Sequence, residues 1–156
     1  MIVIALSIEY TAIDELKEYK NNARTHSPEQ IEQLVSSIQE FGFTNPIIID
    51  ENNVIIAGHG CLAASLKLGY QSAPAIRLAN LSEDQKKALR IADNKLALNA
   101  GWDEQLLAAE LKDIELTGFD MSLIGFSDEE LQNLLSDVEL SLTSDTYSSQ
   151  EGGFSV

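Results

Sequence analysis

Alternating and β-branched stretches predict a small sheet in the first half of the chain. Residues 7–13 alternate polar and apolar side chains, which is the two-residue period of a half-buried strand. The β-branched runs 46–50 and 54–57 are separated by a short polar segment and predict a hairpin. Residues 71–78 predict one more strand. Pro74 would lie at the sheet edge or at the beginning of this strand, because proline has no N–H to donate to a neighbour.

A segment whose apolar residues recur at helical spacing begins at Ser27. Ser27 is the predicted N-cap of a helix, Pro28 fits its first position and Gln30 would complete a capping box. Apolar residues then fall on one face until Gly42, which ends the helix. This pattern predicts an amphipathic helix that lies on the sheet.

The hairpin runs through Gly58 and Gly60 into a short predicted helix, from about Cys61 to Leu68. Glycine permits a left-handed backbone and the close approach of a ligand, while the start of a helix presents unpaired N–H groups and the positive end of its dipole. Such a junction favours anions, phosphates above all. The alternative is a turn that only connects a strand to a helix. The helix would bury the side that carries Leu62, Ala63 and Leu66.

The second half of the chain is predicted to be helical. Ser82 and Gln85 form a second capping box, at the start of a helix that runs through Leu96. Further helices are predicted from Trp102 and from Ser127. After about residue 136 the chain is rich in Ser, Thr, Gly and acidic residues without periodicity, which predicts a flexible tail or linker.

Strands followed by helices predict an α+β fold, with a small mixed sheet packed with helices and a helical C-terminal extension. We expect a first domain at residues 1–100, the helical extension at 101–137 and an acidic, Ser-rich tail or linker at 138–156.

Acidic residues dominate the charged composition. The chain has 25 Asp and Glu against 10 Lys and Arg, and residues 81–156 contain sixteen of the acidic residues but five of the basic ones. Non-specific DNA binding depends on Lys and Arg that displace counterions from phosphates, so the composition argues against it for the isolated chain. The acidity would serve either solubility or a protein partner that docks on the acidic helices.

The cysteine count and the apolar stretches of the sequence bear on the cellular location of the protein. A single Cys is present, so no disulfide framework is expected, and a reducing cytoplasm is the default. The apolar run at residues 1–7 has no basic leader and is expected to form a strand rather than a signal peptide. No stretch is long and apolar enough to span a membrane.

The candidate chemical groups are few. Two His and one Cys are too scattered for a usual zinc site, and no metal site is predicted. The chain contains no nucleophile elbow, Walker motif or dinucleotide fingerprint. Cys61 could be a reactive thiol at a helix start or a small buried side chain. Arg24 and His26, in a polar loop, could meet a phosphate or a carboxylate, or be solvated.

The order of these motifs resembles the ParB/sulfiredoxin domain over roughly residues 7–100. ParB-like members read as an Asn-Pro-Arg loop, a helix, a Gln-Pro-Ile-x-Val strand and a Gly-Glu-Arg-Arg-x-x-Ala phosphate-binding turn. The matching segments here are residues 22–24, the helix ending at 40–43, the strand at 45–49 and the turn at 58–64. Residues 81–103 resemble the subgroup found at the N-terminus of phage and prophage DNA methyltransferases, which implies a role in DNA modification.

The resemblance implies a site for phosphate or a nucleoside di- or triphosphate with Mg²⁺. Its residues would be Asn22, Arg24, Thr44, Asn45, Gly58, His59, Gly60, Cys61, Leu62, Ala63, Asp93 and Asn94. Gly60 and Cys61 stand where nucleotide-binding members have two consecutive arginines, and a lost guanidinium removes a bidentate phosphate contact. We therefore expect weaker binding, carried by backbone N–H groups, His59 and Arg24.

Three functions follow as hypotheses. The first is an accessory module of a DNA modification or phage DNA-processing system, which meets DNA through a fused or partner methyltransferase. The second is an enzyme, either a nuclease or a nucleotide-dependent phosphotransferase. The third is a ligand-free interaction domain. The sulfiredoxin reductase activity is not carried over, because alignment on Ala63 and Ala64 places the catalytic Cys of that enzyme opposite His59. The chain also lacks the Asp/Asn-Pro-Pro-Tyr/Trp motif of an amino-methyltransferase.

Overall fold

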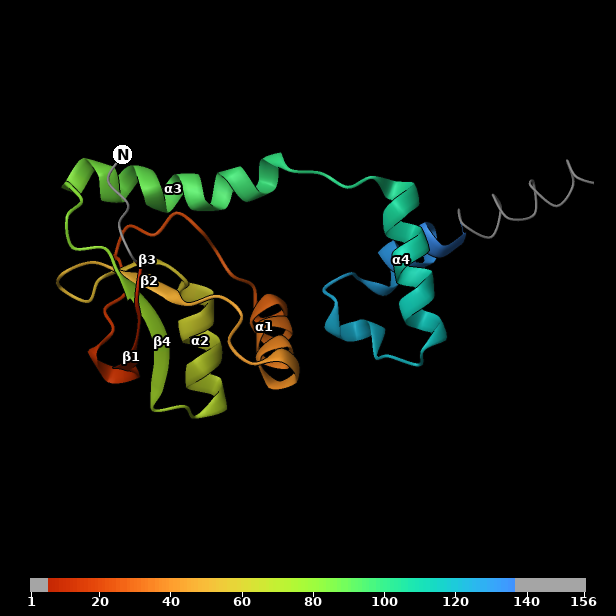
Figure 1. The fold of residues 1–156 in the computed structure, drawn as a ribbon, viewed down its shortest axis with the longest axis horizontal. Coiled ribbons are helices and arrows are strands. Elements are labelled where there is room, and N and C mark those ends of the chain that lie inside the picture. The colour runs from red at the N-terminus through yellow and green to blue at the C-terminus, as the bar shows by residue number, and fades with distance from the viewer. Residues whose placement is uncertain (1–5, 137–156) are drawn as a thin grey trace, which may run out of the picture. The chain divides into compact units, whose positions relative to one another are not determined.

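A computed structural model describes residues 6–136 of the chain. The fold divides into two compact units, Met1–Ala100 and Gly101–Val156, which are described separately (Figure 1). The predicted tail at 138–156 and most of the apolar run at 1–7 lie outside the described residues.

A four-stranded mixed sheet forms the centre of the first unit. Its strands are β1 (Ile8–Ala12), β2 (Ile47–Ile49), β3 (Ile55–Ala57) and β4 (Ser72–Arg77), in the order β1-β4-β2-β3. β4 is antiparallel to β1 and parallel to β2, while β2 and β3 form the predicted antiparallel hairpin. A short 3₁₀ helix, η1 (Ile13–Glu15), follows β1. The α+β prediction with a mixed sheet is confirmed.

Pro74 lies within an interior strand, so its predicted place at an edge or strand beginning is wrong. It pairs with Tyr10 of β1, whereas β2 pairs with β4 only from Ala75 onward. At Pro74 the strand therefore has a neighbour on one side only. On the other side no ladder hydrogen bond requires an N–H, which is why proline is accommodated.

Three helices complete the first unit: α1 (Pro28–Phe41), α2 (His59–Leu68) and α3 (Glu83–Asn99). α2 packs on the sheet through Leu62, and α1 lies beside α2 (Figure 1). The shared core is apolar and consists of Ile13, Leu16, Ile47, Ile49, Ile55, Leu62, Ala73 and Ala75.

The structure corrects two details of these helices. α2 begins at His59, two residues before the predicted start, because left-handed Gly58 serves as its N-cap. Its buried face contains Gly60, Leu62, Ala64 and Ser65 rather than Ala63 and Leu66, since Leu66 is exposed. Small buried residues of this face, Ala64 and Ser65, let the helix lie close to its neighbours.

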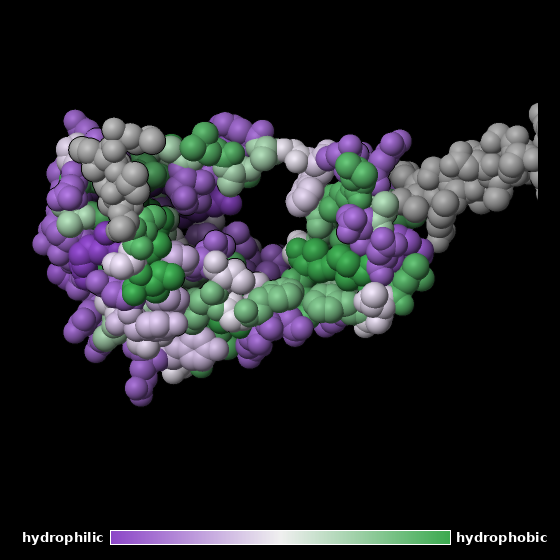
Figure 2. Space-filling model, viewed as in Figure 1, coloured by the Kyte–Doolittle hydropathy of each residue, from purple (hydrophilic) through white to green (hydrophobic). Residues whose placement is uncertain are grey.

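α3 contacts the sheet at β3, where Arg90 Nε donates a hydrogen bond to the Ile55 carbonyl. Its buried side chains are Lys86 and Arg90, whereas Leu96 is exposed. Figure 2 shows hydrophobic and hydrophilic residues intermixed along this helix. The apolar spacing correctly predicted a helix but did not identify its buried face.

The second unit contains α4 (Glu104–Leu116), the 3₁₀ helix η2 (Met121–Leu123) and helical residues 128–136. Asp103 caps α4, because its side chain accepts a hydrogen bond from the Leu106 N–H. Ala108, Leu111 and Leu131 are buried. Among the described residues of the two units, no helix has the length and apolar character needed to cross a membrane.

Candidate functional site

The junction between β3 and α2 has the geometry of an anion-binding turn. Gly58 has φ 105°, and a Cβ added there would lie 3.2 Å from the Ile47 Cα, so glycine is required both by the backbone conformation and by close packing. No side chain caps α2, in contrast to α1, α3 and α4. The first N–H groups of α2 therefore remain available at the positive end of the helix dipole.

A pocket of about 210 Å³ opens at this junction and is called the turn pocket. It gathers eight of the residues proposed from the sequence: Asn22, Arg24, Gly58, His59, Gly60, Cys61, Asp93 and Asn94. His26, Gln30, Leu34, Ile56 and Ala57 complete the lining. Three segments that are distant in sequence thus meet: the loop before α1, the start of α2 and the middle of α3.

Four proposed residues do not line the turn pocket. Leu62 points into the core and is nearly inaccessible. Thr44 and Asn45 are exposed in the segment before β2, and Ala63 is half-buried on α2. Only Leu62 has a clear alternative role, which is core packing.

His26 and Leu34 occupy the space next to Gly60. A Cβ added at Gly60 would lie 2.8 Å from Leu34 Cδ1 and 3.0 Å from His26 Cε1. His26 Nδ1 lies 3.1 Å from Gln30 Oε1 and donates a hydrogen bond to it, because an amide oxygen can only accept. The predicted capping box is therefore only half formed: the Ser27 side chain accepts from the Gln30 N–H, but the Gln30 side chain holds His26. His26 brings an imidazole into the pocket beside Gly60.

His59 has a structural hydrogen bond. Its Nε2 accepts from the backbone N–H of Tyr19 at 3.1 Å, which requires an unprotonated Nε2. Burial lowers the pKa of His59, and the positive charges of Arg90 and His26 lower it further, against an opposing effect of Glu18. His59 thus holds the loop that carries Asn22 and Arg24, and its neutral ring offers a phosphate no positive charge.

Cys61 packs against the core, and burial raises the pKa of its thiol. Of the two alternatives for this residue, the structure favours the small, half-buried side chain over the reactive thiolate. Cys61 still lines the turn pocket, so a longer side chain at this position would begin at the pocket wall.

A buried ionic network holds α3, and with it Asp93 and Asn94, against the hairpin. Lys86 Nζ lies 2.7 Å from Glu51 Oε1, 3.0 Å from Glu83 Oε1 and 3.2 Å from Asp50 Oδ2. Hydrogen bonds to Glu51 and Glu83 raise the pKa of Lys86 above its usual range. Burial alone would raise the pKa of Asp50, but the N–H groups of Val54 and Asn52 and the Lys86 ammonium together lower it. Sequence reasoning assigned no role to these residues, since acidic residues in a turn and a lysine on a helix usually face solvent.

Comparison with known proteins identifies the family. The model of the ParB N-terminal domain matches residues 5–95, and that of the ParB-methyltransferase HTH domain matches residues 105–152. The ParB-like nuclease domain-containing protein YnaK of Escherichia coli K12 is 51% identical over 82 residues, which are 53% of this chain and 94% of that protein.

Solved structures agree on the fold. The C-terminally truncated chromosome-partitioning protein ParB of Caulobacter crescentus, complexed with CTP-γ-S, has a TM-score of 0.67 at 21% identity, covering 82% of this chain and 76% of that one. Sulfiredoxin of Arabidopsis thaliana has a TM-score of 0.43 at 18% identity over 47% of this chain and 86% of that one. The resemblance read from the motif order is confirmed: the chain belongs to the ParB family, with a ParB N-terminal domain followed by a segment that matches a ParB-methyltransferase HTH domain.

Proposed function

We propose that the chain is a nucleotide-binding accessory module of a DNA modification system, and that the turn pocket binds the phosphates of a nucleoside di- or triphosphate. The observation that carries the proposal is the uncapped start of α2, which opens into a pocket lined by Arg24 and His26. Backbone N–H groups at a helix start bind phosphate without sequence-specific side chains. The family's CTP-γ-S complex supports nucleotide binding, although it belongs to another protein.

Phosphate binding here would depend on the loop before α1 rather than on arginines of the turn. Arg24 would provide the guanidinium, and the imidazole of His26 would line the pocket beside Gly60. Asp93 and Asn94 would hold Mg²⁺ or water against the phosphates, because carboxylate and amide oxygens are suitable magnesium ligands.

Calorimetric titration with CTP, ATP and ADP in the presence of Mg²⁺ tests the proposal. We expect saturable binding of at least one nucleotide, and absence of heat at millimolar concentration would refute it. Cys61→Arg restores an arginine of the family pattern at the pocket wall and should tighten binding about tenfold. Ala63→Arg is the matched control, since it adds the same charge to α2 outside the pocket.

The accessory role is supported by the match to a ParB-methyltransferase HTH domain. The matched residues 105–152 contain eleven Asp and Glu and a single Lys. Such a segment repels the DNA phosphates that helix-turn-helix domains usually contact through basic side chains. We therefore propose that DNA contact depends on a fused or partner methyltransferase. Co-purification of such a methyltransferase, and stronger DNA binding in its presence, would test this role.

A nuclease or phosphotransferase is not proposed, because its support is the name of the curated relative and the family resemblance alone.

A further inference from the structure

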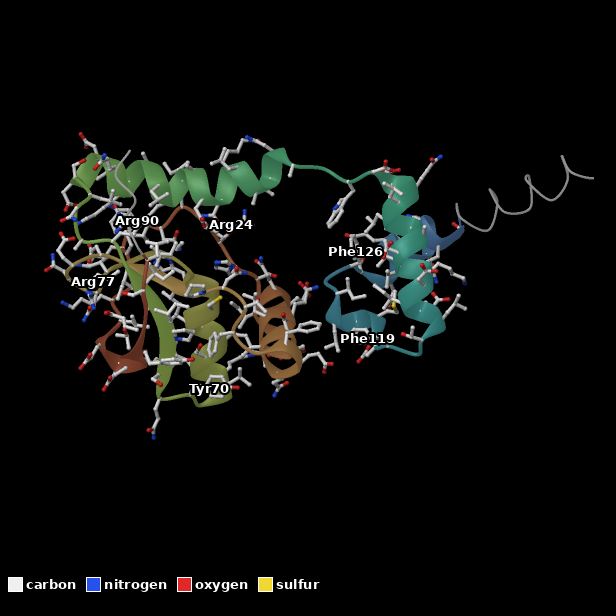
Figure 3. The ribbon with its side chains drawn as sticks, in the orientation of Figure 1. Arg24, Tyr70, Arg77, Arg90, Phe119 and Phe126 are labelled. Atoms are coloured by element: carbon white, nitrogen blue, oxygen red, sulfur yellow. The ribbon has the colours of Figure 1, made fainter. Side chains whose placement is uncertain are left out.

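Helix α4 of the second unit packs on its neighbours through one side only. Ala108 and Leu111, one turn apart on that side, are each 2% exposed. Figure 3 shows Phe119 and Phe126, from the segment that follows α4, on one side of the helix. The helix is not polar on its remaining surface, where Figure 2 shows hydrophobic and hydrophilic residues next to each other.

A second set of apolar residues on α4 is exposed. Leu106 is 65% exposed and Leu116 is 73% exposed, and Ala109 and Asp113 between them are exposed as well. The four residues follow one another at intervals of three, four and three positions, so they form a stripe along the helix, called the α4 seam. This is the spacing of the positions through which one helix of a coiled coil contacts another. The seam therefore has the pattern of a surface that receives a second helix.

The charge around the seam indicates what that second helix carries. Residues 101–136 contain nine Asp and Glu and a single Lys, Lys112, whose ammonium lies 3.1 Å from the Glu115 carboxylate. Asp113 lies in the seam and Glu110 lies beside it on the helix surface. Among the described residues, neither takes part in an ion pair. A helix that has lysines or arginines beside its apolar residues would cover the leucines and complement these carboxylates.

A second copy of the chain does not have this chemistry. Parallel pairing of two α4 helices would set Asp113 against the same residue of the other copy, and like charges inside a seam are costly. Antiparallel pairing would still bring together two units that each have nine acidic residues and one basic residue in this region. The charge therefore favours a basic partner over self-association.

We propose that the α4 seam docks a basic amphipathic helix of a partner protein. The apolar residues of that helix lie on Leu106, Ala109 and Leu116, and a Lys or Arg lies opposite Asp113. A polar residue at one seam position fixes the register of paired helices, so Asp113 selects the partner as well as its alignment. The proposal names the kind of partner that the proposed accessory role requires, and to that extent it rests on the proposed function. It does not depend on nucleotide binding in the turn pocket.

Fluorescence anisotropy of a labelled synthetic helix, titrated with the full chain, tests the proposal. The probe has about three heptads, with leucine at the seam positions except for one central lysine, and lysine at the flanking positions to prevent self-pairing. The control peptide has the same residues in scrambled order and thus the same charge without a seam. We expect saturable binding of the probe, about tenfold or more tighter than binding of the control. Absence of binding, or equal binding of both peptides, would overturn the proposal.

Paired leucine variants test the place of docking. Leu106→Gln with Leu116→Gln removes the apolar ends of the seam and should weaken binding of the probe about tenfold or more. Leu96→Gln with Leu98→Gln makes the same change on α3, at residues that are 67% and 62% exposed, and should leave binding within about twofold of the native value. Equal effects of the two pairs would refute the assignment to α4.

A charge exchange tests the register. Asp113→Lys should weaken binding of the probe about tenfold and should strengthen, by a similar factor, binding of a second probe with glutamate in place of the central lysine. Glu129→Lys changes the net charge of the second unit equally at an exposed residue outside α4 and should not exchange the preference for the two probes. The same preference in both variants would show that Asp113 does not face the partner.

Two further measurements distinguish this proposal from its alternatives. A dimer of the full chain in sedimentation, separated by Leu106→Gln with Leu116→Gln, would overturn the proposal in favour of a second copy. A methyltransferase that co-purified equally with the native chain and with this variant would leave the accessory role intact and would overturn the docking surface. Binding of the probe without co-purification of any methyltransferase would support the docking surface and count against the accessory role.

Discussion

Replacing Lys86 by Met should lower the free energy of unfolding of the first unit by about 3 kcal/mol. Lys86 is 1% exposed, and its ammonium contacts Asp50, Glu51 and Glu83. Methionine retains most of the volume and the flexible stem, so the substitution removes the charge with little change in packing.

The size of this loss in the free energy of unfolding depends mainly on Asp50. Its side chain is 5% exposed, so without Lys86 it becomes a buried anion whose counter-charge is lost. The N–H groups of Asn52 and Val54 still donate to Asp50 Oδ1, at 2.8 and 2.9 Å, which places the cost at the lower end of the 3–5 kcal/mol typical of a broken buried pair. Glu51 and Glu83 are exposed and regain water, so they add little to the cost.

Native-state hydrogen exchange of peptides covering residues 47–57 measures this change. The single Trp, Trp102, lies in the second unit, so its fluorescence transition in urea serves as an internal control and should not move. Lys87→Met makes the same change at the next residue, which is exposed, and should stay within about 0.5 kcal/mol. A loss below about 1 kcal/mol for Lys86→Met, or an equal loss for Lys87→Met, would refute the reasoning.

Asp50→Asn in the Lys86→Met background should recover about 2 kcal/mol, because the neutral amide keeps an oxygen for the two N–H donors and needs no cation. If the double variant were as unstable as the sum of the single ones, the cost would come from packing and not from the unpaired carboxylate.

Three further predictions concern the turn, its histidine and the acidic unit. Gly58→Ala should destabilise the first unit by about 1–3 kcal/mol. Gly69→Ala should destabilise it less, since both glycines have positive φ but only a Cβ at Gly58 would meet Ile47. Equal urea midpoints of the two variants would contradict this prediction. The pKa of His59 in the folded chain is lowered from 6.5, so the unfolded state binds the proton more readily. The contribution of His59 to stability should therefore be complete above pH 6.5 and should decrease as the pH falls below it. His59→Gln should remove that part of the pH dependence in urea titrations at pH 7.5 and 5.5. Duplex DNA should bind the isolated full chain with a dissociation constant of about 100 μM or weaker at physiological salt, and fluorescence anisotropy that gave submicromolar binding would overturn the electrostatic argument. Glu110→Gln with Asp113→Asn should then strengthen DNA binding, whereas Lys112→Gln should weaken it.

The elements of the first unit were predictable because they depend on local signals. The β-branched runs at 46–50 and 54–57 became β2 and β3, and Ser27 caps α1 as its hydroxyl and the following proline indicate. Pro74 was misplaced because its tolerance depends on where β2 begins to pair. Sequence spacing contains no information on that long-range register.

The candidate site was predictable only where a motif or the family order marked it. Glycines at 58 and 60 indicated the turn, and the structure places Asn22, Arg24, Asp93 and Asn94 beside it. The contribution of Gln30 was not foreseeable, because its expected role in a capping box conflicts with its hydrogen bond to His26. Thr44 and Asn45 lie outside the turn pocket, which shows that adjacency in a motif does not ensure that residues share a pocket.

The buried cations of α3 link the stability of the first unit to the turn pocket. Lys86 fixes the first turn of α3 to the hairpin, and Arg90, one turn later, fixes the helix to β3 and to Tyr19. Asp93 and Asn94 follow on the same helix and line the turn pocket. A helix held by apolar contacts could slide, whereas two cations that each have specific oxygen or ring partners define its register. Loss of Lys86 should therefore weaken nucleotide binding at the turn pocket even at temperatures where the first unit remains folded.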